Sequence, residues 1–451
     1  MKILIRGAGD LATGIASRLY GAGHQILMTE IAVPLTVRRT VALSRAVYEG
    51  RAQVEEMKGV LVKDQAGAEK VMADGDIAVM VDEKAACCEW FRPDVIVDAI
   101  LAKKNLGTKI TDAPFVIGVG PGFTAGTDCN CVVETKRGHT LGNIIWRGEA
   151  IPNTGVPGNV AGYTIERLIR AEADGILKPK AKIGDHVEKG SVVAVTGGVP
   201  VYAQMTGIVR GMLQSGVQVS KNLKIGDIDA RAEISHCYTI SDKARAIGGG
   251  VLEAVMGFER MKDEFAIVIL AAGAGTRFGG NKLNALVRNK PLYRHTLERA
   301  EAFGAFPAYI VTGSEGIARE AERTGITAVW NKEPERGIAL SLTLGLKKAL
   351  GDRPGLKGVL FSVCDQPGLD TSTMQQIFRT ASRHPGSIVC AGSGERTGNP
   401  VCWDRTFFQE LLTLDGDEGG RKIMRKYREK VRIIQADPEE LKDIDRREDL
   451  V

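Results

Sequence analysis

The chain has 451 residues, of which 44% are hydrophobic and 25% are charged, and its mean hydropathy is −0.06. This composition is typical of folded globular proteins, and no apolar stretch is long enough to span a membrane. Sixty Lys and Arg against 55 Asp and Glu give a small positive excess that is spread along the chain, so nucleic acid is not a predicted partner.

The N-terminal sequence and the cysteines indicate a compartment. Residues 1–7 form a strand-like run without a basic leader, a long apolar segment or a cleavage site. The eight cysteines lack the paired spacing of a zinc site or of a small disulfide scaffold. We therefore expect a cytoplasmic protein with no membrane partner.

Residues 1–165 alternate short β-branched runs with helical patterns, which is typical of an α/β domain with a mostly parallel sheet. The predicted strands are residues 3–5, 25–29, 60–62, 77–81, 95–99 and 115–119.

A glycine turn follows the first predicted strand. The sequence Gly-Ala-Gly-Asp-Leu-Ala at residues 7–12 opens a helix, and Glu30 ends the next strand, where a ribose-binding acid would stand. This matches the alanine variant of the dinucleotide fingerprint and predicts a Rossmann-like fold. Gly7, Gly9, Ala12 and Glu30 would bind an NAD-like dinucleotide, and the alternative is a helix N-terminus packed tightly on a sheet.

Further motifs lie at residues 98–105, 120–126, 134–139 and 152–155. They resemble an accessory family associated with selenium-dependent molybdenum hydroxylases, and the resemblance covers residues 1–258. It implies a role in maturing such a hydroxylase, which would then be a partner, but it implies no mechanism. Cys129, Cys131 and His139 could handle sulfur, selenium or molybdenum, whereas a cysteine can equally be a small core residue.

Residues 174–229 contain an internal repeat, which indicates a duplication of short strands and glycine turns. Equivalent positions are related by a shift of 32: Gly175 and Gly207, Ile176 and Ile208, Gly184 and Gly216, Val187 and Val219, Lys189 and Lys221, Val193 and Ile225. The segment resembles the barrel-sandwich fold of biotinyl and lipoyl carriers. A carrier needs a lysine on the turn between its halves, and none lies between Lys189 and Lys221, so a docking module is predicted instead.

A charged stretch at residues 259–264 separates a glycine-containing helix from a new strand and places the main boundary there. Beyond it, strands predicted at 308–312, 358–363, 387–391 and 431–436 indicate a second α/β domain. The predicted domains are a Rossmann-like domain at 1–165, a barrel-sandwich domain at 170–235, a helical return and linker at 236–262, and a Rossmann-like nucleotidyltransferase domain at 263–451.

The clearest chemical signal is the sequence Leu-Ala-Ala-Gly-Ala-Gly-Thr-Arg-Phe-Gly-Gly-Asn-Lys-Leu at residues 270–283, directly after a predicted strand. Small residues let backbone N–H groups reach phosphate oxygens, and Arg277 and Lys282 can neutralise these oxygens. A P-loop would need Gly-Lys-Ser or Gly-Lys-Thr, so that type of ATPase is excluded. A mere tight turn would need neither cation, and we therefore predict a phosphate-binding loop.

Asp365 follows the strand predicted at 358–363 and would lie at the carboxyl edge where open α/β sheets bind ligands. Mg²⁺ favours one or two carboxylates together with phosphate oxygens, and Asp445, after the last predicted strand, could supply the second. Either acid alone would be interpreted as a solvated loop residue or a helix cap. Beside the basic loop, the pair predicts a Mg²⁺ site.

These motifs resemble those of the molybdenum-cofactor nucleotidyltransferases, the MobA-like superfamily, over nearly all of residues 264–451. Residues 336–342, 396–401 and 416–421 contribute to the resemblance. The chain is most similar to the cytidylyltransferase branch, because the guanylyltransferase branch tends to have glycine where Ala272 stands. The resemblance implies transfer of CMP from CTP to the terminal phosphate of Mo-molybdopterin, with release of pyrophosphate.

The resemblance also implies a role for individual residues. The catalytic residues would be Arg277, Lys282 and Asp365, with Asp365 and Asp445 holding the metal. The nucleotide would be bound by Leu270, Ala271, Ala272, Gly273, Gly275, Lys282, Ser341 and Asp365. The pterin substrate would contact Asn399, Asp417 and Arg421, which could instead be structural residues.

The first hypothesis is a maturation enzyme in which the C-terminal domain makes the cytosine-dinucleotide cofactor and the N-terminal region handles it or delivers it to a hydroxylase. The alternative is a cytidylyltransferase for a small alcohol phosphate or sugar phosphate, with a non-catalytic N-terminal scaffold. Both use CTP and Mg²⁺, so trials with different acceptors would separate them.

Overall fold

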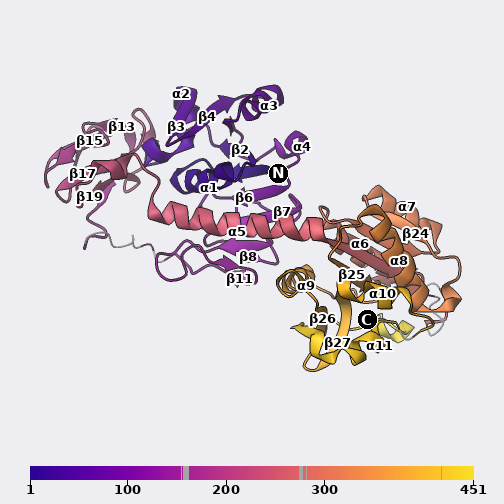
Figure 1. Cartoon of the computed structure of the whole chain (residues 1–451). Coiled ribbons are helices and arrows are strands. Elements are labelled where there is room, and N and C mark those ends of the chain that lie inside the picture. Colours follow the sequence, from indigo (N-terminus) through magenta and orange to yellow (C-terminus); the bar gives the residue numbers. More distant parts are fainter. Residues whose placement is uncertain (154, 156–161, 274–277, 281, 418, 451) are drawn as a thin grey trace. The chain divides into compact units, whose positions relative to one another are not determined.

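The computed structural model describes residues 1–153, 155, 162–273, 278–280, 282–417 and 419–450. The described chain is α/β, as predicted, and divides into a first unit, Met1–Val255, and a second unit, Met256–Val451 (Figure 1). The division falls within helix α5 (Asp242–Glu264). The charged stretch at 259–264 is therefore the end of this helix rather than a separate linker, because buried Phe258 and Met261 continue its apolar face.

Among the described residues of the first unit, nine strands form one sheet in the order β10-β9-β7-β6-β1-β2-β5-β4-β3. Only the pairs β3–β4 and β9–β10 are antiparallel within it. The strands are β1 (Lys2–Arg6), β2 (Gln25–Glu30), β3 (Arg51–Val54), β4 (Met57–Val62), β5 (Ile77–Val81), β6 (Val95–Asp98), β7 (Phe115–Val119), β9 (Cys131–Val133) and β10 (Ile144–Ile145). The helices are α1 (Asp10–Gly21), α2 (Ala46–Glu49), α3 (Gln65–Ala73) and α4 (Cys88–Phe91), and β8 (Thr124–Ala125) pairs with β11 (Gly148–Glu149).

The strand order of this sheet reverses between β1 and β6. After β1 the chain continues to β2 on one side, and after β6 it continues to β7 on the other. Gly7, which follows β1, has a φ of +96°, and a Cβ atom there would lie 2.9 Å from the carbonyl oxygen of Ala99. Glycine thus allows the ends of the two strands to approach. Open α/β sheets bind ligands outside the strand ends at such a reversal.

The repeat forms a barrel-sandwich in which two halves exchange strands, and this confirms the predicted duplication. The shift of 32 relates β13 to β17, β14 to β18 and β15 to β19. Each half lends a strand to the other, because β13 pairs with β18 and β14 pairs with β17. The strands are β12 (Leu168–Arg170), β13 (Gly175–Pro179), β14 (His186–Val187), β15 (Val192–Thr196), β16 (Val199–Tyr202), β17 (Gly207–Met212), β18 (Gln218–Val219) and β19 (Lys224–Asp229).

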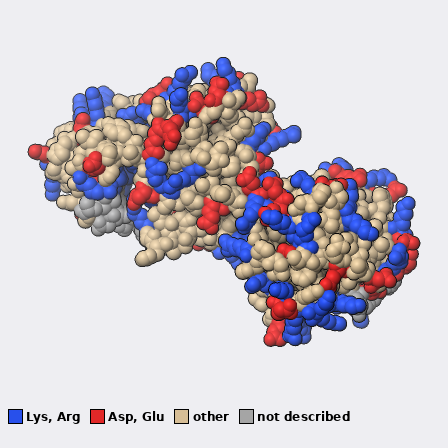
Figure 2. Space-filling model, in the orientation of Figure 1, with Lys and Arg blue, Asp and Glu red and all other residues tan. Residues whose placement is uncertain are grey.

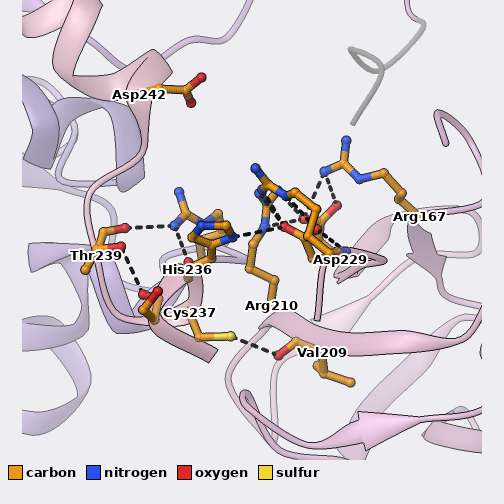
Figure 3. Close-up of polar contacts among 12 residues, drawn as sticks. Arg167, Val209, Arg210, Asp229, His236, Cys237, Thr239 and Asp242 are labelled. Carbon is orange, nitrogen blue, oxygen red and sulfur yellow. Dashed lines mark hydrogen bonds and ion pairs between the residues drawn. The ribbon is translucent and has the colours of Figure 1, made fainter. Parts of the chain in front are cut away.

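A network of buried charges lies where the barrel-sandwich meets the rest of the first unit (Figure 3). Asp227 accepts hydrogen bonds from Arg167 at 3.0 Å and from Nε of Arg210 at 2.9 Å. Asp229 pairs with Arg231 at 2.6 Å, and Nδ1 of His236 is 4.0 Å from it. Both carboxylates are almost fully buried, so their charges depend on these partners.

Arg38 connects this region to the Rossmann-like sheet. Its guanidinium donates to the carbonyl oxygens of His236 at 3.0 Å and Thr239 at 3.1 Å, and to Asp10 in the first turn of α1 at 3.0 Å. The hydroxyl of Thr40 donates to the carbonyl of Cys237 at 2.5 Å. Residues 236–239, which follow the barrel-sandwich, are therefore held against the segment that follows β2.

This network predicts a loss of stability in acid. Burial alone would raise the pKa of Asp229, but hydrogen bonds and the charges of Arg231 and Arg210 outweigh burial and lower the pKa from 3.8 to about 2. Between these values the unfolded chain takes up a proton that the folded chain does not. The stabilisation is therefore complete above about pH 4 and is lost as the pH falls toward 2.

We expect Asp229→Asn to lower the urea midpoint of the first unit at pH 6, and we expect the difference from the native chain to shrink between pH 4 and pH 2. The matched control is Glu188→Gln, because Glu188 is an exposed carboxylate in the same barrel-sandwich. A difference that stays constant with pH would contradict the role given to the ionised Asp229.

Within the described residues of the second unit, seven strands form a sheet in the order β24-β23-β20-β25-β27-β26-β28. Strand β27 is antiparallel to both of its neighbours. The strands are β20 (Phe265–Ala271), β23 (Ala308–Thr312), β24 (Thr327–Trp330), β25 (Gly358–Val363), β26 (Ile388–Ser393), β27 (Arg396–Asp404) and β28 (Val431–Gln435), with β21 (Leu286–Val287) paired to β22 (Lys290–Pro291) outside the sheet. The helices are α6 (Leu292–Glu301), α7 (Glu315–Arg323), α8 (Ile338–Asp352), α9 (Thr371–Arg383), α10 (Phe408–Leu412) and α11 (Arg421–Lys426).

The surface carries both signs of charge. On the face shown in Figure 2, Lys and Arg are interspersed with Asp and Glu over each unit. None of the described helices combines the length and the apolar character needed to cross a membrane.

Candidate functional site

The candidate site of the second unit lies at the carboxyl ends of the parallel neighbours β20 and β25. Leu270 near the end of β20 pairs with Val363, the last residue of β25. Ala272 and Gly273 follow the first strand and Asp365 follows the second, so the glycine-rich loop and the strand-end acid meet at one edge. Gly275 and Arg277, to which the sequence assigned phosphate contacts, lie outside the described residues.

Lys282 lies between two carboxylates. Its Nζ donates to Oδ2 of Asp365 at 3.0 Å and to Oδ1 of Asp445 at 3.1 Å. The Lys282 side chain is 14% exposed, against 28% for Asp365 and 51% for Asp445. Burial alone would lower the pKa of Lys282, but the charge of Asp365 and the hydrogen bonds to both acids outweigh burial and raise this pKa. The ammonium group is therefore a fixed positive charge at the strand ends.

Backbone and amide hydrogen bonds bring the two acidic segments together. The N–H of Ile444 donates to the carbonyl of Asp365 at 2.9 Å. Nε2 of Gln366 donates to Asp443 at 3.0 Å. The structure thus places Asp445 beside Asp365, although the two residues are 80 positions apart in the sequence.

Arg299 on α6 positions the loop after β25, and sequence reasoning missed it. Its guanidinium donates to the carbonyl oxygens of Gln366 at 2.9 Å, Pro367 at 3.3 Å and Leu369 at 3.4 Å. It also donates to the hydroxyl of Thr296 at 2.8 Å. Burial lowers the pKa of Arg299 to about 10, which leaves it charged at neutral pH. Asp365 directly precedes the carbonyls that Arg299 holds.

A pocket of about 530 Å³ lies in front of the strand ends and contains several of the predicted nucleotide contacts. Ser341 reaches it because α8 packs Leu342 and Leu346 on the sheet, which sets the first turn of this helix at the carboxyl edge. Asn331, which sequence reasoning also missed, donates from Nδ2 to the Ser341 hydroxyl at 3.0 Å. Of the predicted nucleotide contacts, the lining includes Leu270, Ala272, Gly273, Lys282, Ser341 and Asp365, whereas Ala271 is buried in the strand.

An adjoining pocket of about 550 Å³ contains the predicted substrate contacts Asn399, Asp417 and Arg421. It shares Lys282 and Asp365 with the first pocket, so the charged pair stands between the two spaces. Its lining also includes aromatic residues, namely Phe278, Phe361 and Trp403.

The motif at 336–342 and the motif at 416–421 meet at this boundary. Gly337 has a φ of +88°, and a Cβ atom there would lie 2.5 Å from Oδ1 of Asp417. The N–H of Ala339 donates to the carbonyl of Gly416 at 3.1 Å. Glycine at 337 is therefore required for the start of α8 to lie against Asp417, which lines both pockets.

Asp365 and Asp445 fit the predicted Mg²⁺ by their chemistry. Each has a carboxylate oxygen within 3.1 Å of the same ammonium group, so the two acids are close enough to share a cation. In the described part of the chain, no group of three or more His, Cys, Asp or Glu is placed to hold a metal ion. A metal here would need phosphate oxygens as further ligands, which is how Mg²⁺ is usually bound with nucleotides.

The structure also brings together the predicted dinucleotide residues of the first unit. The carboxylate of Glu30 accepts the N–H of Ala8 at 3.0 Å, between Gly7 and Gly9, and burial raises its pKa. Ala12 is buried in α1. The segment that follows β2 lies close to the glycine turn, since the N–H of Ser44 donates to the carbonyl of Ala8 at 2.8 Å.

The structure does not form a metal cluster from Cys129, Cys131 and His139. Both cysteines are fully buried, and burial raises the pKa of Cys129 to about 12, whereas His139 is exposed. These cysteines are small core residues in this unit, as the alternative interpretation held.

Comparison with known proteins classifies the second unit. Residues 267–431 match the MobA-like NTP transferase domain. Together with the paired pockets and the basic residue between two acids, this defines a nucleotidyltransferase domain.

Individual relatives match parts of the chain. The protein described as "Uncharacterized protein YqeB" from Escherichia coli K12 is 50% identical over 254 residues, which are 56% of this chain and 47% of that protein. This alignment is longer than the second unit, so it includes residues of the first. A probable molybdenum cofactor guanylyltransferase from Thermococcus gammatolerans is 35% identical over 80 residues, which are 17% of this chain and 42% of that protein. The chain thus spans less than half the length of either curated relative.

Among solved structures, Rv0371c from Mycobacterium tuberculosis H37Rv is 27% identical to this chain. The match covers 41% of this chain and 94% of that one, with a TM-score of 0.36.

Proposed function

We propose that the second unit transfers CMP from CTP to the terminal phosphate of Mo-molybdopterin and releases pyrophosphate, and that the first unit serves the maturation of a molybdenum hydroxylase in the cytoplasm. The observation that carries the proposed transfer is the pair of adjoining pockets with Lys282 and Asp365 in both. A transferase of this kind must hold a donor and an acceptor on either side of the reacting phosphorus.

The adjoining pockets suit the two substrates by their linings. The first pocket, with the glycine turn and Ser341, would take the nucleotide. The second, with aromatic residues and Arg421, would take a flat heterocycle that bears a phosphate. Aromatic walls favour a pterin over a small sugar or alcohol phosphate, which would present mainly hydroxyl groups.

The reaction would proceed by attack of an oxygen of the acceptor phosphate on the α-phosphorus of the nucleotide. The new phosphorus–oxygen bond joins the two phosphates, and the bond to the β-phosphate breaks, so that pyrophosphate leaves with the electron pair. Lys282 would neutralise charge on the α-phosphate and the leaving group, which is the main catalytic task in phosphoryl-type transfer. When bound at Asp365 and Asp445, Mg²⁺ would supply further charge neutralisation of the phosphates.

The choice of molybdenum cofactor chemistry rests on the MobA-like match and on the relative named as a molybdenum cofactor guanylyltransferase. The choice of CTP rests on Ala272, whose methyl group lines the nucleotide pocket. In a glycine variant of this position a purine would have more room.

The test is incubation of the full chain with Mo-molybdopterin, Mg²⁺ and each nucleoside triphosphate, followed by identification of the dinucleotide and measurement of pyrophosphate. We expect the cytosine dinucleotide and one equivalent of pyrophosphate. A purine product would refute the choice of CTP, and turnover with a small sugar or alcohol phosphate but not with the pterin would refute the acceptor. No product with any pair would refute the proposed function.

The same assay tests the role of Ala272. We expect Ala272→Gly to shift the ratio of rates with CTP and GTP toward GTP by about tenfold, since one methyl group in a pocket discriminates by roughly 1–3 kcal/mol. The rate of the variant with CTP is the internal control for folding. An unchanged ratio would show that Ala272 does not select the base.

A further inference from the structure

The first unit contains a pocket of about 350 Å³ with four cationic side chains in its lining, Lys103, Lys136, Arg137 and Lys243. They come from segments far apart in the sequence. Lys103 follows β6, Lys136 and Arg137 follow β9, and Lys243 lies in the first turn of α5. Leu11, Leu101, Pro121, Ile151 and Pro152 supply an apolar part of the wall.

The pocket lies at the ligand-binding edge of the sheet. Several of its lining residues follow the carboxyl ends of β6, β7 and β9, and Leu11 extends it to the start of α1 after β1. This edge includes the reversal of strand order between β1 and β6. Open α/β sheets bind their ligands at that position.

A buried carboxylate fixes the loops that form the pocket. Glu134, 2% exposed, accepts the N–H groups of Thr135 and Lys136 at 2.7 Å each and the N–H of Ile151 at 2.8 Å. One side chain therefore ties the loop after β9 to the segment that includes Asn153. A site whose loops are held by such bonds needs little ordering when a ligand binds.

The charges in the pocket are not balanced by the described residues. Arg137 makes a bidentate pair with Asp242 at 2.7 and 3.0 Å. Lys103, Lys136 and Lys243 have no ion-pair partner among the described carboxylates, although the amide oxygen of Asn153, in the orientation that satisfies its neighbours, is 3.0 Å from Nζ of Lys103.

Lys243 is held close to other cations. Burial, and after it the charge of Arg137, lowers the pKa of Lys243, although the charges of Asp10, Glu134 and Asp242 act in the opposite direction. Asp10 is paired with Arg38, so when only Glu134 and Asp242 are set against the four cations of the lining, an excess of two positive charges remains. A dianion placed among these side chains would relieve their repulsion.

We propose that this pocket binds a small organic molecule through a phosphate or diphosphate group. The cations bind the phosphate oxygens, and the apolar wall holds the organic part. The site is independent of nucleotidyl transfer in the second unit, and it differs from the predicted dinucleotide position, where Glu30 itself occupies the N–H of Ala8.

Hydrogen exchange of the full chain, read peptide by peptide, tests this proposal because it separates the two units. The probes are pyrophosphate, which presents the charge alone, and ADP, which adds an organic part. We expect exchange in peptides covering 99–106 and 134–153 to slow by about threefold or more at saturation, with tighter binding of ADP than of pyrophosphate and weaker binding at higher salt. Protection by pyrophosphate alone would refute the role of the apolar wall.

The variants are Lys103→Gln, Lys243→Gln and their combination. We expect the local dissociation constant to rise about tenfold in each single variant and about a hundredfold in the double variant, since each charge-assisted contact of this kind is worth about tenfold. Lys104→Gln is the matched control, because Lys104 is an exposed neighbour that does not line the pocket, and we expect less than a twofold change.

Three outcomes would overturn the proposal. These are no protection of these peptides by either probe, a loss of binding in the Lys104→Gln control equal to that in the pocket variants, and protection confined to residues 7–30. Exchange in peptides of β1, β2 and β5 shows whether each variant is folded. If the double variant does not fold, Lys103→Gln alone tests the proposal, because Lys103 is exposed and its replacement leaves the core unchanged.

Discussion

Replacing Lys282 or Asp365 by alanine is expected to lower the rate of nucleotidyl transfer by about 10²–10³-fold, which corresponds to roughly 3–4 kcal/mol of transition-state stabilisation. Lys282 is a fixed cation at the boundary of the two pockets, and Asp365 holds it there at 3.0 Å. The loss should appear mainly in kcat, because charge develops on the leaving pyrophosphate during the reaction.

The double variant shows whether the two residues act as a unit. If they do, Lys282→Ala with Asp365→Ala will be little slower than either single variant. Lys290→Ala, which removes a half-exposed lysine paired with Glu298, and Asp415→Ala, which removes an exposed carboxylate, are the matched controls. If the single variants have nearly the native kcat, neither residue belongs to the catalytic site.

The sequence predicts strands well where they are buried and parallel. β5 (Ile77–Val81) is a continuous apolar run and β25 (Gly358–Val363) is apolar apart from Ser362, because both faces of the sheet around them are covered. β27 (Arg396–Asp404) was not predicted as a strand, since Gly398, Asn399 and Pro400 have low β propensity. It forms because it pairs antiparallel with β25 and β26, and such distant partners leave no local pattern.

The domain boundary shows a similar limit. A charged run resembles a linker, but residues 259–264 are the last turns of α5, and Phe258 and Met261 continue its buried face there. The duplication at 174–229, by contrast, could be identified because a repeat compares the sequence with itself and needs no knowledge of its partners.

At the candidate site, the sequence indicates the groups that meet phosphate but not the groups that hold them. Lys282 and Asp365 belong to motifs in which residue type and strand-end position together point to a role. Arg299 and Asn331 belong to no motif, because the partners of Arg299 are backbone carbonyls about 70 residues away and the partner of Asn331 is the Ser341 hydroxyl on another element. These contacts exist only after the fold has formed.

Arg299→Met is expected to affect both stability and catalysis. The substitution keeps an unbranched apolar stem but removes the guanidinium, so the carbonyls of Gln366, Pro367 and Leu369 lose their charged donor in a buried region. The free energy of unfolding of the second unit should fall by about 2–4 kcal/mol, since hydrogen bonds to charged groups contribute roughly 1.5–3 kcal/mol each and are not additive.

The catalytic effect separates a positioning residue from a merely structural one. At a temperature where the variant is folded, we expect kcat to fall about tenfold or more and KM for the nucleotide to rise less than kcat falls, because Asp365 is only one of the residues that line the nucleotide pocket. Arg299→Lys should recover part of kcat, since an ammonium group can still donate to these carbonyls. Arg294→Met on the same helix is the control, because Arg294 is paired with partly exposed acids whose loss costs at most about 1 kcal/mol. If folded Arg299→Met has the native kcat, Arg299 stabilises the loop without positioning Asp365 for the reaction.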